Sequence, residues 1–555
     1  MAAIHPLYYL HNFERALAWI AQRYSDLLDS EEQQFLVQFA ALPTPSRALL
    51  VRMLMRRGPW FRASKLVYAE IPDVGAAAQA LTALGWLNTQ ASMSLAELFD
   101  LHTKAELAAL FTGPLGSQGA RKSDWLQTLG STHAQPQPQP YAAWNPQASE
   151  PVWRVMAAER IERLRLMFFG NLHQDWSEFV LSDLGVFKYE PVAFDASSRA
   201  FQARGDIAAY LAQHACRQAM DEGADAAAML EAIAGCQSSN AWLEKRRAKL
   251  LLRLGNACER QQHWADALQA YALCTYPGAR HRRIRVLERL ERHQEALDQA
   301  LLARQAPESD EEAQKLQRML PRLLRNAGQT KAGKRSPPGQ ALLQMRSDIA
   351  LEGPVAAMSV EFALRQHWHS DASPVFYVEN ALVNSLFGLL CWPAVFAPLQ
   401  GAFFHPFQSG PADLSAPDFA DRRQAQFATC LAELDTDSYR HTILQRYADK
   451  QGVQSPFVFW QMLSAELLTL ALECIPAEHL KRLFQRLLAD VKTNRSGLPD
   501  LVRFWPAEKR YAFVEVKGPG DKLQDNQIRW LQYCSDHGIP VSVCHVQWRE
   551  SAEPG

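Results

Sequence analysis

The stretch GLPDLVRFWPAEKRYAFVEVKGPG, residues 497–520, marks a change in the character of this sequence. Before it, segments such as 30–41 and 205–219 repeat apolar residues three and four positions apart, which is typical of helices. Here two runs rich in β-branched and aromatic residues flank the short polar break PAEKR, and this pattern predicts two strands joined by a hairpin-like connection. The sequence therefore predicts a sheet near the C-terminus of a mostly α-helical chain.

The second of these strands carries charged residues on one of its faces. Alternation along the strand puts Tyr511, Phe513, Glu515 and Lys517 on the same side. Charged side chains inside an apolar strand are costly to bury unless they are paired or bind a metal. If the hairpin forms, Asp500 approaches Glu515, and two carboxylates with a few waters suit Mg²⁺ or Mn²⁺.

The composition is that of a folded protein with several domains, on the order of three to five for this length. Hydrophobic residues make up 48% of the chain and charged residues 21%, which excludes a disordered or collagen-like protein. The longest apolar run, 386–399, contains one glycine and two prolines and is shorter than the roughly 18 residues that a membrane span needs. Because the N-terminus also lacks the pattern of a secretory signal, we expect a cytoplasmic protein without a membrane partner.

Cysteine usage and charge narrow the function classes further. The nine cysteines are scattered without a C-x-x-C pair, which argues against a disulfide framework or a zinc finger and indicates reduced, mostly buried thiols. The net charge is −1, so any binding of nucleic acid must come from local clusters of lysine and arginine.

Residues 1–130 are expected to form a helical DNA-binding region. Residues 56–88 suit a winged-helix-like unit, and the segments SLAELFDLHTKAELAALF and RKSDWLQTL, within 92–130, resemble a SAP-type DNA-binding module. Positively charged residues flank these elements, where they would contact DNA phosphates, although a solvated surface role is the alternative for each. These residues are Arg62, Lys65, Arg121 and Lys122.

Three further regions are predicted before the C-terminal sheet. Residues 131–151, rich in proline and glutamine, are expected to be a linker. Residues 152–327 are expected to be helical, with two segments that resemble degenerate tetratricopeptide repeats, although plain antiparallel helix pairs explain them too. In this region, the arginine-rich segment 280–292 is either a DNA track or a helix whose arginines pair with glutamates. Residues 328–345 are expected to be a basic linker.

The start of that linker, GQTKAGK at 328–334, matches the beginning of a phosphate-binding P-loop. We reject this interpretation, because Arg335 replaces the required Ser or Thr and Pro337-Pro338 stands where a helix must continue.

The pattern of the PD-(D/E)XK nuclease superfamily is present here as Pro499-Asp500 and Glu515-Val516-Lys517. A longer resemblance, to the VRR-NUC domain of the Fanconi-associated nuclease family, covers the segments GLPDLV, VEVKGPGDKL, NQIRWLQYC and GIPVSVCHV. Upstream, VENALVNSLFGLLCW resembles the family's helix with the first acidic ligand, Glu379, and DWSEFVLSDLGVFKYE in the middle of the chain resembles the family weakly. The resemblance implies an α/β restriction-endonuclease-like domain over 346–555. Eukaryotic relatives carry a ubiquitin-binding zinc finger for which this chain shows no Cys/His spacing, so it looks like a bacterial member.

The resemblance also implies a mechanism. Asp500, Glu515, Glu379 and the Val516 carbonyl would hold one or two Mg²⁺ or Mn²⁺ ions, and Lys517 would orient or help deprotonate the attacking water. The implied activities are 5′-flap endonuclease and 5′-to-3′ exonuclease in DNA interstrand cross-link repair, leaving 5′-phosphates.

Three other residues have weaker signals. Gln527 matches a family position close to the site, with a helix N-terminal polar role as the alternative. Lys492 and Arg495 are expected to bind neighbouring DNA phosphates or to be solvated. Two rival functions remain open, namely a non-catalytic scaffold that binds DNA junctions and a sequence-specific restriction-type endonuclease.

Overall fold

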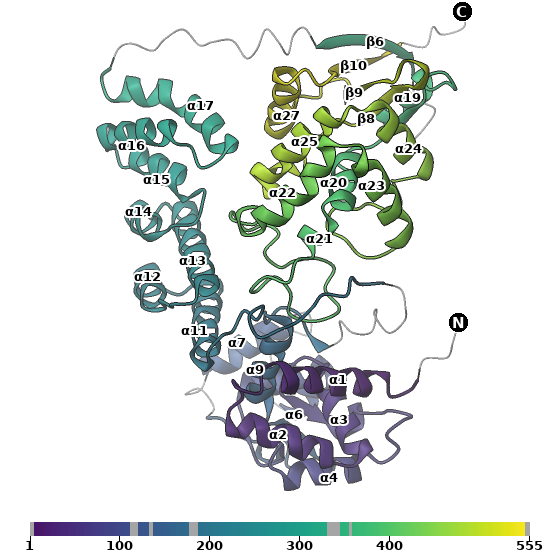
Figure 1. The fold of residues 1–555 in the computed structure, drawn as a ribbon. Helices are drawn as coiled ribbons and strands as arrows, with labels where there is room; N and C mark the ends of the chain where they lie inside the picture. Colours follow the sequence, from purple (N-terminus) through teal and green to yellow (C-terminus); the bar gives the residue numbers. More distant parts are fainter. Residues whose placement is uncertain are drawn as a thin grey trace, which may run out of the picture. The chain divides into compact units, whose positions relative to one another are not determined.

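The computed structural model describes residues 5–111, 120–132, 137–176, 187–329, 345–353 and 358–549 of the 555-residue chain. The chain forms two compact units, residues 1–187 and 188–555, which we call the N-terminal and C-terminal units (Figure 1). Residues 112–119, most of the segment 175–190 and nearly all of the expected basic linker, including residues 330–334 of its P-loop-like start, lie outside the described residues.

The first part of the N-terminal unit combines helices with a small sheet. Strand β5 lies between β1 and β2 and is antiparallel to both, so the sheet order is β1-β5-β2. Helix α2 begins with a capping box, in which the Asp29 side chain and the Glu32 side chain each accept a backbone N–H of the other residue. The elements are α1 Tyr8–Arg23, α2 Ser30–Ala41, α3 Thr44–Leu54, β1 Trp60–Arg62, α4 Val74–Ala83, β2 Leu87–Asn88 and β5 Val152–Val155.

The second part is a helical module with its own core. Helices α5 and α6 both start with capping boxes, built on Ser94 and Thr103, and short strands β3 and β4 pair antiparallel. The elements are β3 Ser92–Met93, α5 Leu95–Leu101, α6 Lys104–Leu110, α7 Lys122–Thr132, β4 Gln139–Pro140 and α8 Tyr141–Trp144.

The expected linker at 131–151 differs from the structure. Residues 139–144 pair with and pack against the helical module, and residues 152–155 complete the first sheet instead of opening the helical repeat. The reason is that Tyr141 and Val152 are buried in the same core as Trp60 and Trp125, so apolar anchors between the prolines outweigh the extended tendency of the segment. Helix α9, Ala158–Phe169, then packs on α1 within the N-terminal unit.

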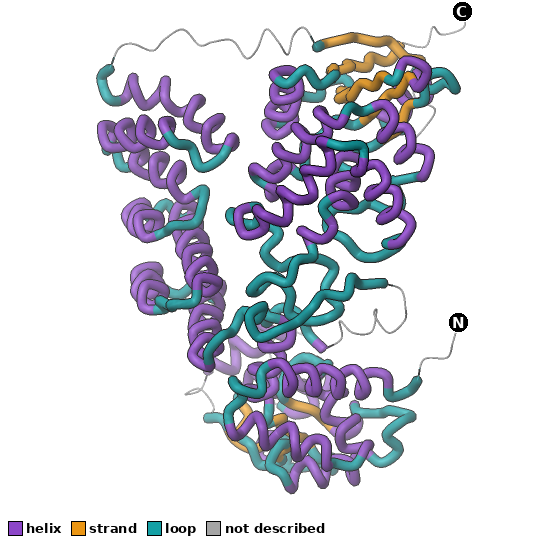
Figure 2. The backbone as a smooth tube through the Cα atoms, in the orientation of Figure 1, coloured by secondary structure: helices purple, strands orange, loops and turns teal. Residues whose placement is uncertain are grey.

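Residues 204–326 of the C-terminal unit are helical, and successive helices pack on one another (Figure 2). Gly255 of α13 lies against the ring of Tyr271 of α14, where an added Cβ would stand only 2.5 Å from the ring, so a glycine allows these helices to approach. The helices are α11 Arg204–Asp221, α12 Ala226–Gly235, α13 Ala241–Arg260, α14 Trp264–Leu273, α15 Ala279–Arg289, α16 His293–Gln305 and α17 Asp310–Asn326.

The arginine-rich segment 280–292 forms α15 and the turn after it. Arg282 and Arg285 both pair with the buried Glu259, at 2.9 and 3.1 Å, and Arg292 pairs with Glu295 at 2.6 Å. These contacts favour the ion-pair interpretation of the segment over a DNA track.

The C-terminal unit ends in a five-stranded mixed sheet of order β6-β10-β9-β8-β7. Strand β8 is antiparallel to β7 and β9, whereas β10 is parallel to β9 and β6, so the predicted hairpin of residues 497–520 is confirmed. Helix α27 connects the parallel strands β9 and β10. The strands are β6 Arg346–Glu352, β7 Val375–Tyr377, β8 Leu501–Trp505, β9 Arg510–Lys517 and β10 Val541–Arg549.

Helices bury one side of this sheet. Every residue of α20 is buried, and its side chains share one large core with Phe504, Tyr511 and Phe513 of the hairpin. The apolar run at 386–399 therefore belongs to a protein core, and no helix among the described residues is long and apolar enough to cross a membrane. The helices are α19 Val360–Trp368, α20 Leu382–Leu390, α21 Trp392–Val395, α22 Gln424–Ala432, α23 Ser438–Asp449, α24 Ala465–Cys474, α25 Ala477–Ala489, α26 Val491–Asn494 and α27 Asp525–Asp536.

Candidate active site

The hairpin brings Asp500 to the end of β9. In its register Leu501 faces Val514, so Asp500, one residue earlier, lies beside the last residues of the partner strand. The Val516 N–H donates to Asp500 Oδ2 at 2.8 Å, and the Val378 N–H donates to the Asp500 carbonyl at 2.8 Å. Asp500 is therefore fixed between the ends of β9 and β7.

Glu515 is the most deeply buried group of the site, with 1% of the residue exposed. Its Oε1 accepts from Lys517 Nζ at 2.7 Å and from Gln527 Nε2 at 2.6 Å. Its Oε2 is buried and has no hydrogen-bond partner among the described residues. A buried carboxylate oxygen without a hydrogen-bond partner costs folding free energy unless a further ligand binds it.

The two carboxylates are hard to ionise together. Burial raises the pKa of Asp500 well above its usual range, and neighbouring Glu361 and Glu379 raise it further, although the Val516 N–H and Lys517 act against this. Burial and the nearby Asp500 raise the pKa of Glu515, against the effect of Lys517. One lysine is thus shared by a crowded group of acids, and the site carries excess negative charge when these acids are ionised.

Glu379 stands apart from this buried group. It is exposed, two residues after the end of β7, and one carboxylate oxygen accepts from the Tyr377 hydroxyl. Its charge still raises the pKa of Asp500 and Glu515, so it lies within electrostatic reach. Among the residues that the structure describes, no three His, Cys, Asp or Glu side chains are grouped closely enough to hold a metal ion.

Glu361 is an acidic neighbour that sequence reasoning missed. It lies in the first turn of α19, and its charge raises the pKa of Asp500 and Tyr377. Nothing in the sequence around 361 distinguishes it from a helix N-terminal glutamate on a surface, because only the packing of α19 near the sheet brings it to the site.

The donor chemistry fits a hard divalent cation. The buried Glu515 oxygen lacks a partner, the remaining candidates are carboxylate and carbonyl oxygens, and such oxygens are the ligands that Mg²⁺ and Mn²⁺ prefer.

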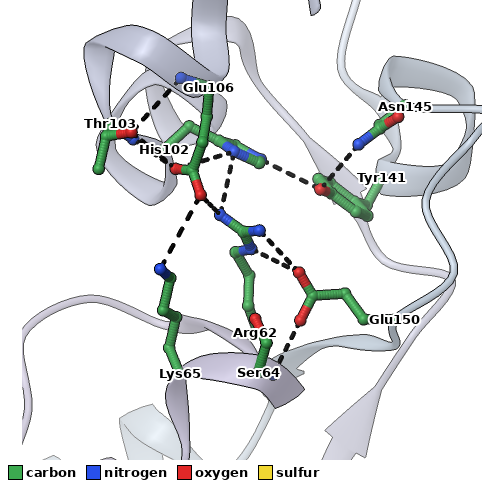
Figure 3. A network of polar contacts seen from close by, with 9 residues as sticks. All are labelled: Arg62, Ser64, Lys65, His102, Thr103, Glu106, Tyr141, Asn145 and Glu150. Carbon is green, nitrogen blue, oxygen red and sulfur yellow. Dashed lines mark hydrogen bonds and ion pairs between the residues drawn. The ribbon is translucent and has the colours of Figure 1, made fainter. Parts of the chain in front are cut away.

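Arg62 belongs to an ion-pair network (Figure 3). Its guanidinium donates to Glu106 at 2.6 Å and to Glu150 at 2.8 Å, and only 13% of its side chain is exposed. This arrangement favours a structural role for Arg62 over contact with phosphate. Lys65 lies 3.9 Å from Glu106 and is mostly exposed.

The other expected DNA contacts fall into two groups. Arg121 is exposed and Lys122 half-buried at the start of α7. Arg495 instead donates to the Pro456 carbonyl and lies over the Phe457 ring, and burial lowers its pKa, so its surroundings favour a structural role.

Lys492 joins a cluster of cations that the sequence does not reveal. Lys249 is exposed at the surface, but partial desolvation lowers its pKa, and the nearby charges of Lys492, Arg246 and Arg217 lower it further. Arg246 lies 3.8 Å from the centre of the Tyr210 ring. Arg217 reaches a carboxylate at 4.0 Å, but no ion pair within the described part of the chain neutralises the other three. We call Arg217, Arg246, Lys249 and Lys492 the cation cluster; it joins α11 and α13 to α26.

These features define a nuclease of the restriction-endonuclease-like class, and comparison with known proteins agrees. Family profiles match "FAN1, HTH domain" at residues 7–88, "Fanconi anemia-associated nuclease SAP domain" at 92–144 and "VRR-NUC domain" at 435–548. The Fanconi-associated nuclease 1 homolog of Pseudomonas aeruginosa is 51% identical over 98% of this chain and 96% of its own length. The chain belongs to the Fanconi-associated nuclease family, and the predicted fold class is confirmed.

More distant relatives and solved structures agree with this assignment. The homolog of Oryza sativa subsp. japonica is 26% identical over 97% of this chain, which spans 62% of that protein. Two crystal structures of paFAN1, bound to 2nt and to 1nt 5′flap DNA with gap, superpose with TM-scores of 0.90 and 0.89 at 50% identity, over 99% of this chain and all of each matched chain.

Proposed function

We propose that this protein is a metal-dependent, structure-specific deoxyribonuclease that cuts branched DNA at 5′ flaps, with Asp500, Glu515 and Lys517 as its hydrolytic centre. The observation that carries the proposal is the buried pair of acids served by one lysine, with one Glu515 oxygen left without a partner. The stability of the fold does not explain two buried acids beside one lysine, because a single ion pair or apolar residues at these positions would cost less free energy to bury.

Asp500, Glu515, the Val516 carbonyl and Glu379 are the groups that would hold the metal, either Mg²⁺ or Mn²⁺. When bound, it supplies charge neutralisation at the scissile phosphate and an activated water. Lys517 keeps its ammonium group at the Glu515 carboxylate, where it can orient the attacking water and stabilise charge that develops on the phosphate. As the family resemblance implies, hydrolysis at this site leaves a 5′-phosphate.

The remaining parts of the chain supply DNA binding. Lys65, Arg121 and Lys122 of the N-terminal unit are exposed or half-buried and remain our candidates for phosphate contacts. The cation cluster is a stronger candidate in the C-terminal unit, since it gathers like charges that a phosphate would neutralise. Lys492 belongs to α26, which ends six residues before Asp500. The residue that would hold a phosphate is therefore close in sequence to the hydrolytic centre. We place this activity in the bacterial cytoplasm, where cross-linked DNA is repaired.

We propose residues 7–176 as the DNA-binding region, 204–326 as the helical repeat and 345–549 as the nuclease region; the helix and strand bounds support this division.

The test is cleavage of end-labelled 5′-flap and unbranched duplex DNA in Mg²⁺ or Mn²⁺ by the wild type and by Asp500→Ala and Lys517→Ala. We expect the wild type alone to cut, with strong preference for the flap. Binding of flaps without cutting by the wild type would support a non-catalytic scaffold. Cutting of unbranched duplex at fixed sequences would support a restriction-type enzyme.

A further inference from the structure

Helix α17, the last of the helical repeat, touches the nuclease region through polar side chains on one face. Residues 310, 314 and 318 are spaced four apart and therefore share that face. Asp310 accepts from Arg486 of α25 at 3.0 Å, Gln314 accepts from Arg529 of α27 at 2.6 Å, and Arg318 donates both of its terminal nitrogens to Asp525 of α27 at 2.6 Å.

The order of these contacts shows how the two helices run. Position 318 pairs with 525 and position 314 with 529, so α17 and α27 lie antiparallel along this face. The bidentate geometry of the Arg318 contact fixes both the distance and the orientation of the first turn of α27. Arg486 strengthens the contact because its guanidinium is buried over the rings of Trp530 and Tyr533, also on α27.

The first turn of α27 is also where the nuclease region touches its buried glutamate. Gln527 accepts the Gln524 N–H at 2.8 Å with its amide oxygen and donates its amide nitrogen to Glu515 at 2.6 Å. Asp525 is two residues away in the same turn. Arg318 therefore connects to Glu515 in two contacts, Arg318 with Asp525 and Gln527 with Glu515, which the first turn of α27 joins.

We propose that Arg318 is a positioning residue for hydrolysis: α17 of the helical repeat holds the first turn of α27 through Asp525, and this keeps Gln527 on Glu515. The inference rests on the proposed function, because it assigns the helical repeat a part in aligning the same site. A small displacement of an aligned catalytic group lowers the reaction rate more than it lowers the binding affinity. We therefore expect the loss of Arg318 to slow cleavage without weakening DNA binding.

A matched control lies one turn away on the same helix. Arg322 also forms a bidentate pair, with Glu288 of α15 at 2.5 and 2.7 Å, and about half of its side chain is exposed, as for Arg318. Its partner belongs to the helical repeat, so breaking this pair removes a similar contact without touching α27.

The experiment measures single-turnover cleavage of a 5′ flap, flap affinity and thermal unfolding for both variants. We expect Arg318→Glu to cut about fivefold more slowly with affinity unchanged, while Arg322→Glu cuts at the wild-type rate. Adding Asp525→Arg to Arg318→Glu restores the rate to within about twofold of wild type, since the pair reforms with exchanged charges. In a Gln527→Ala background, Arg318→Glu has no further effect, because the positioned group is already gone.

Hydrogen exchange at residues 518–530 gives a readout that does not depend on activity. We expect faster exchange there in Arg318→Glu and not in Arg322→Glu. The inference is overturned if Arg318→Glu cleaves the flap and exchanges hydrogen at the wild-type rates. It is also overturned if Arg318→Glu slows cleavage as much in the Gln527→Ala background as in the wild type. Failure of the wild type to cut overturns the proposed function instead, and the exchange data then still decide whether α17 holds α27.

Discussion

The cluster around Arg62 in the N-terminal unit and the cluster around Lys517 in the nuclease sheet each combine a central cation with at least two carboxylates, yet the pKa values of these carboxylates shift in opposite directions. Around Arg62, the Thr103 N–H and the guanidinium lower the pKa of Glu106 to about 2, and contacts from Ser64 and Arg62 outweigh burial to lower the pKa of Glu150 (Figure 3). Around Lys517, burial and mutual repulsion raise the pKa of both Asp500 and Glu515.

The difference teaches which cluster serves stability and which serves chemistry. In the Arg62 cluster each carboxylate has several donors, so the charges are neutralised where they stand. In the Lys517 cluster, one Glu515 oxygen has no partner, and the fold tolerates this cost at a site that is organised for a further ligand.

The same substitution in both clusters should separate the two roles most strongly. Glu515→Gln removes a charge from the hydrolytic centre, and we expect flap cleavage to fall by at least about 10³-fold while flap binding is kept. Glu150→Gln weakens the contacts of Arg62 and Ser64, and we expect lower stability with normal cleavage by the folded protein. Single-turnover cleavage measures the activity of each variant, and urea unfolding measures its stability. An equal loss of cleavage in the two variants would contradict the difference between the clusters.

Removing the cation of the N-terminal cluster should cost stability. Arg62→Met leaves Glu106 and Glu150 without their main partner, and we expect a loss of about 3 kcal/mol in the free energy of unfolding. The control is Arg160→Met, which breaks a more exposed pair with Glu31 and should change stability by less than about 1 kcal/mol. A small effect at Arg62 would show that this cluster is no more stabilising than a surface pair.

The pH dependence of stability should differ in sign between the clusters. Because the folded pKa of Asp500 is raised, the folded state keeps a proton that the unfolded chain has lost, and this contribution to stability disappears as pH rises through the folded pKa. Asp500→Asn is neutral at every pH, so we expect it to be more stable than wild type by about 1–2 kcal/mol at pH 8 in EDTA, with no gain at pH 4.

Glu150→Gln should show the opposite behaviour. The folded pKa of Glu150 is lowered, so its contribution to stability is present above the unfolded pKa and is lost as pH falls through the folded pKa. The variant should therefore be less stable than wild type at pH 8, with the difference shrinking in acid. Urea unfolding across this pH range is the measurement, and the same sign for both variants would refute the contrast.

The smallest effects are expected in the cation cluster, which resembles the hydrolytic centre in having unneutralised charge. Lys249→Ala and Lys492→Ala should each weaken flap binding by about threefold to tenfold and reduce its salt dependence by about one unit of slope. Lys509→Ala, an exposed lysine in the hairpin turn, is the control. Affinity measured against salt concentration tests this, and an unchanged slope for Lys249→Ala would remove the cluster from the DNA path.

How much the sequence predicted depends on the distance over which the signal acts. Alternation within 497–520 predicted the hairpin and the approach of Asp500 to Glu515, because both follow from local strand geometry. The structure differs from the predicted linker at residues 139–144, because Tyr141 is buried in a core that only the tertiary fold creates. The cation cluster joins residues more than 200 positions apart, and only the packing of the repeat against the nuclease region brings Lys249 to Lys492.

Single-turnover cleavage of a 5′ flap by saturating Lys517→Ala in Mn²⁺ tests the central claim most directly. The hydrolytic centre proposed here predicts that this variant binds the flap with wild-type affinity and cuts it at least about 10³-fold more slowly. Cleavage at the wild-type rate would contradict it and would place the hydrolytic centre elsewhere in the chain.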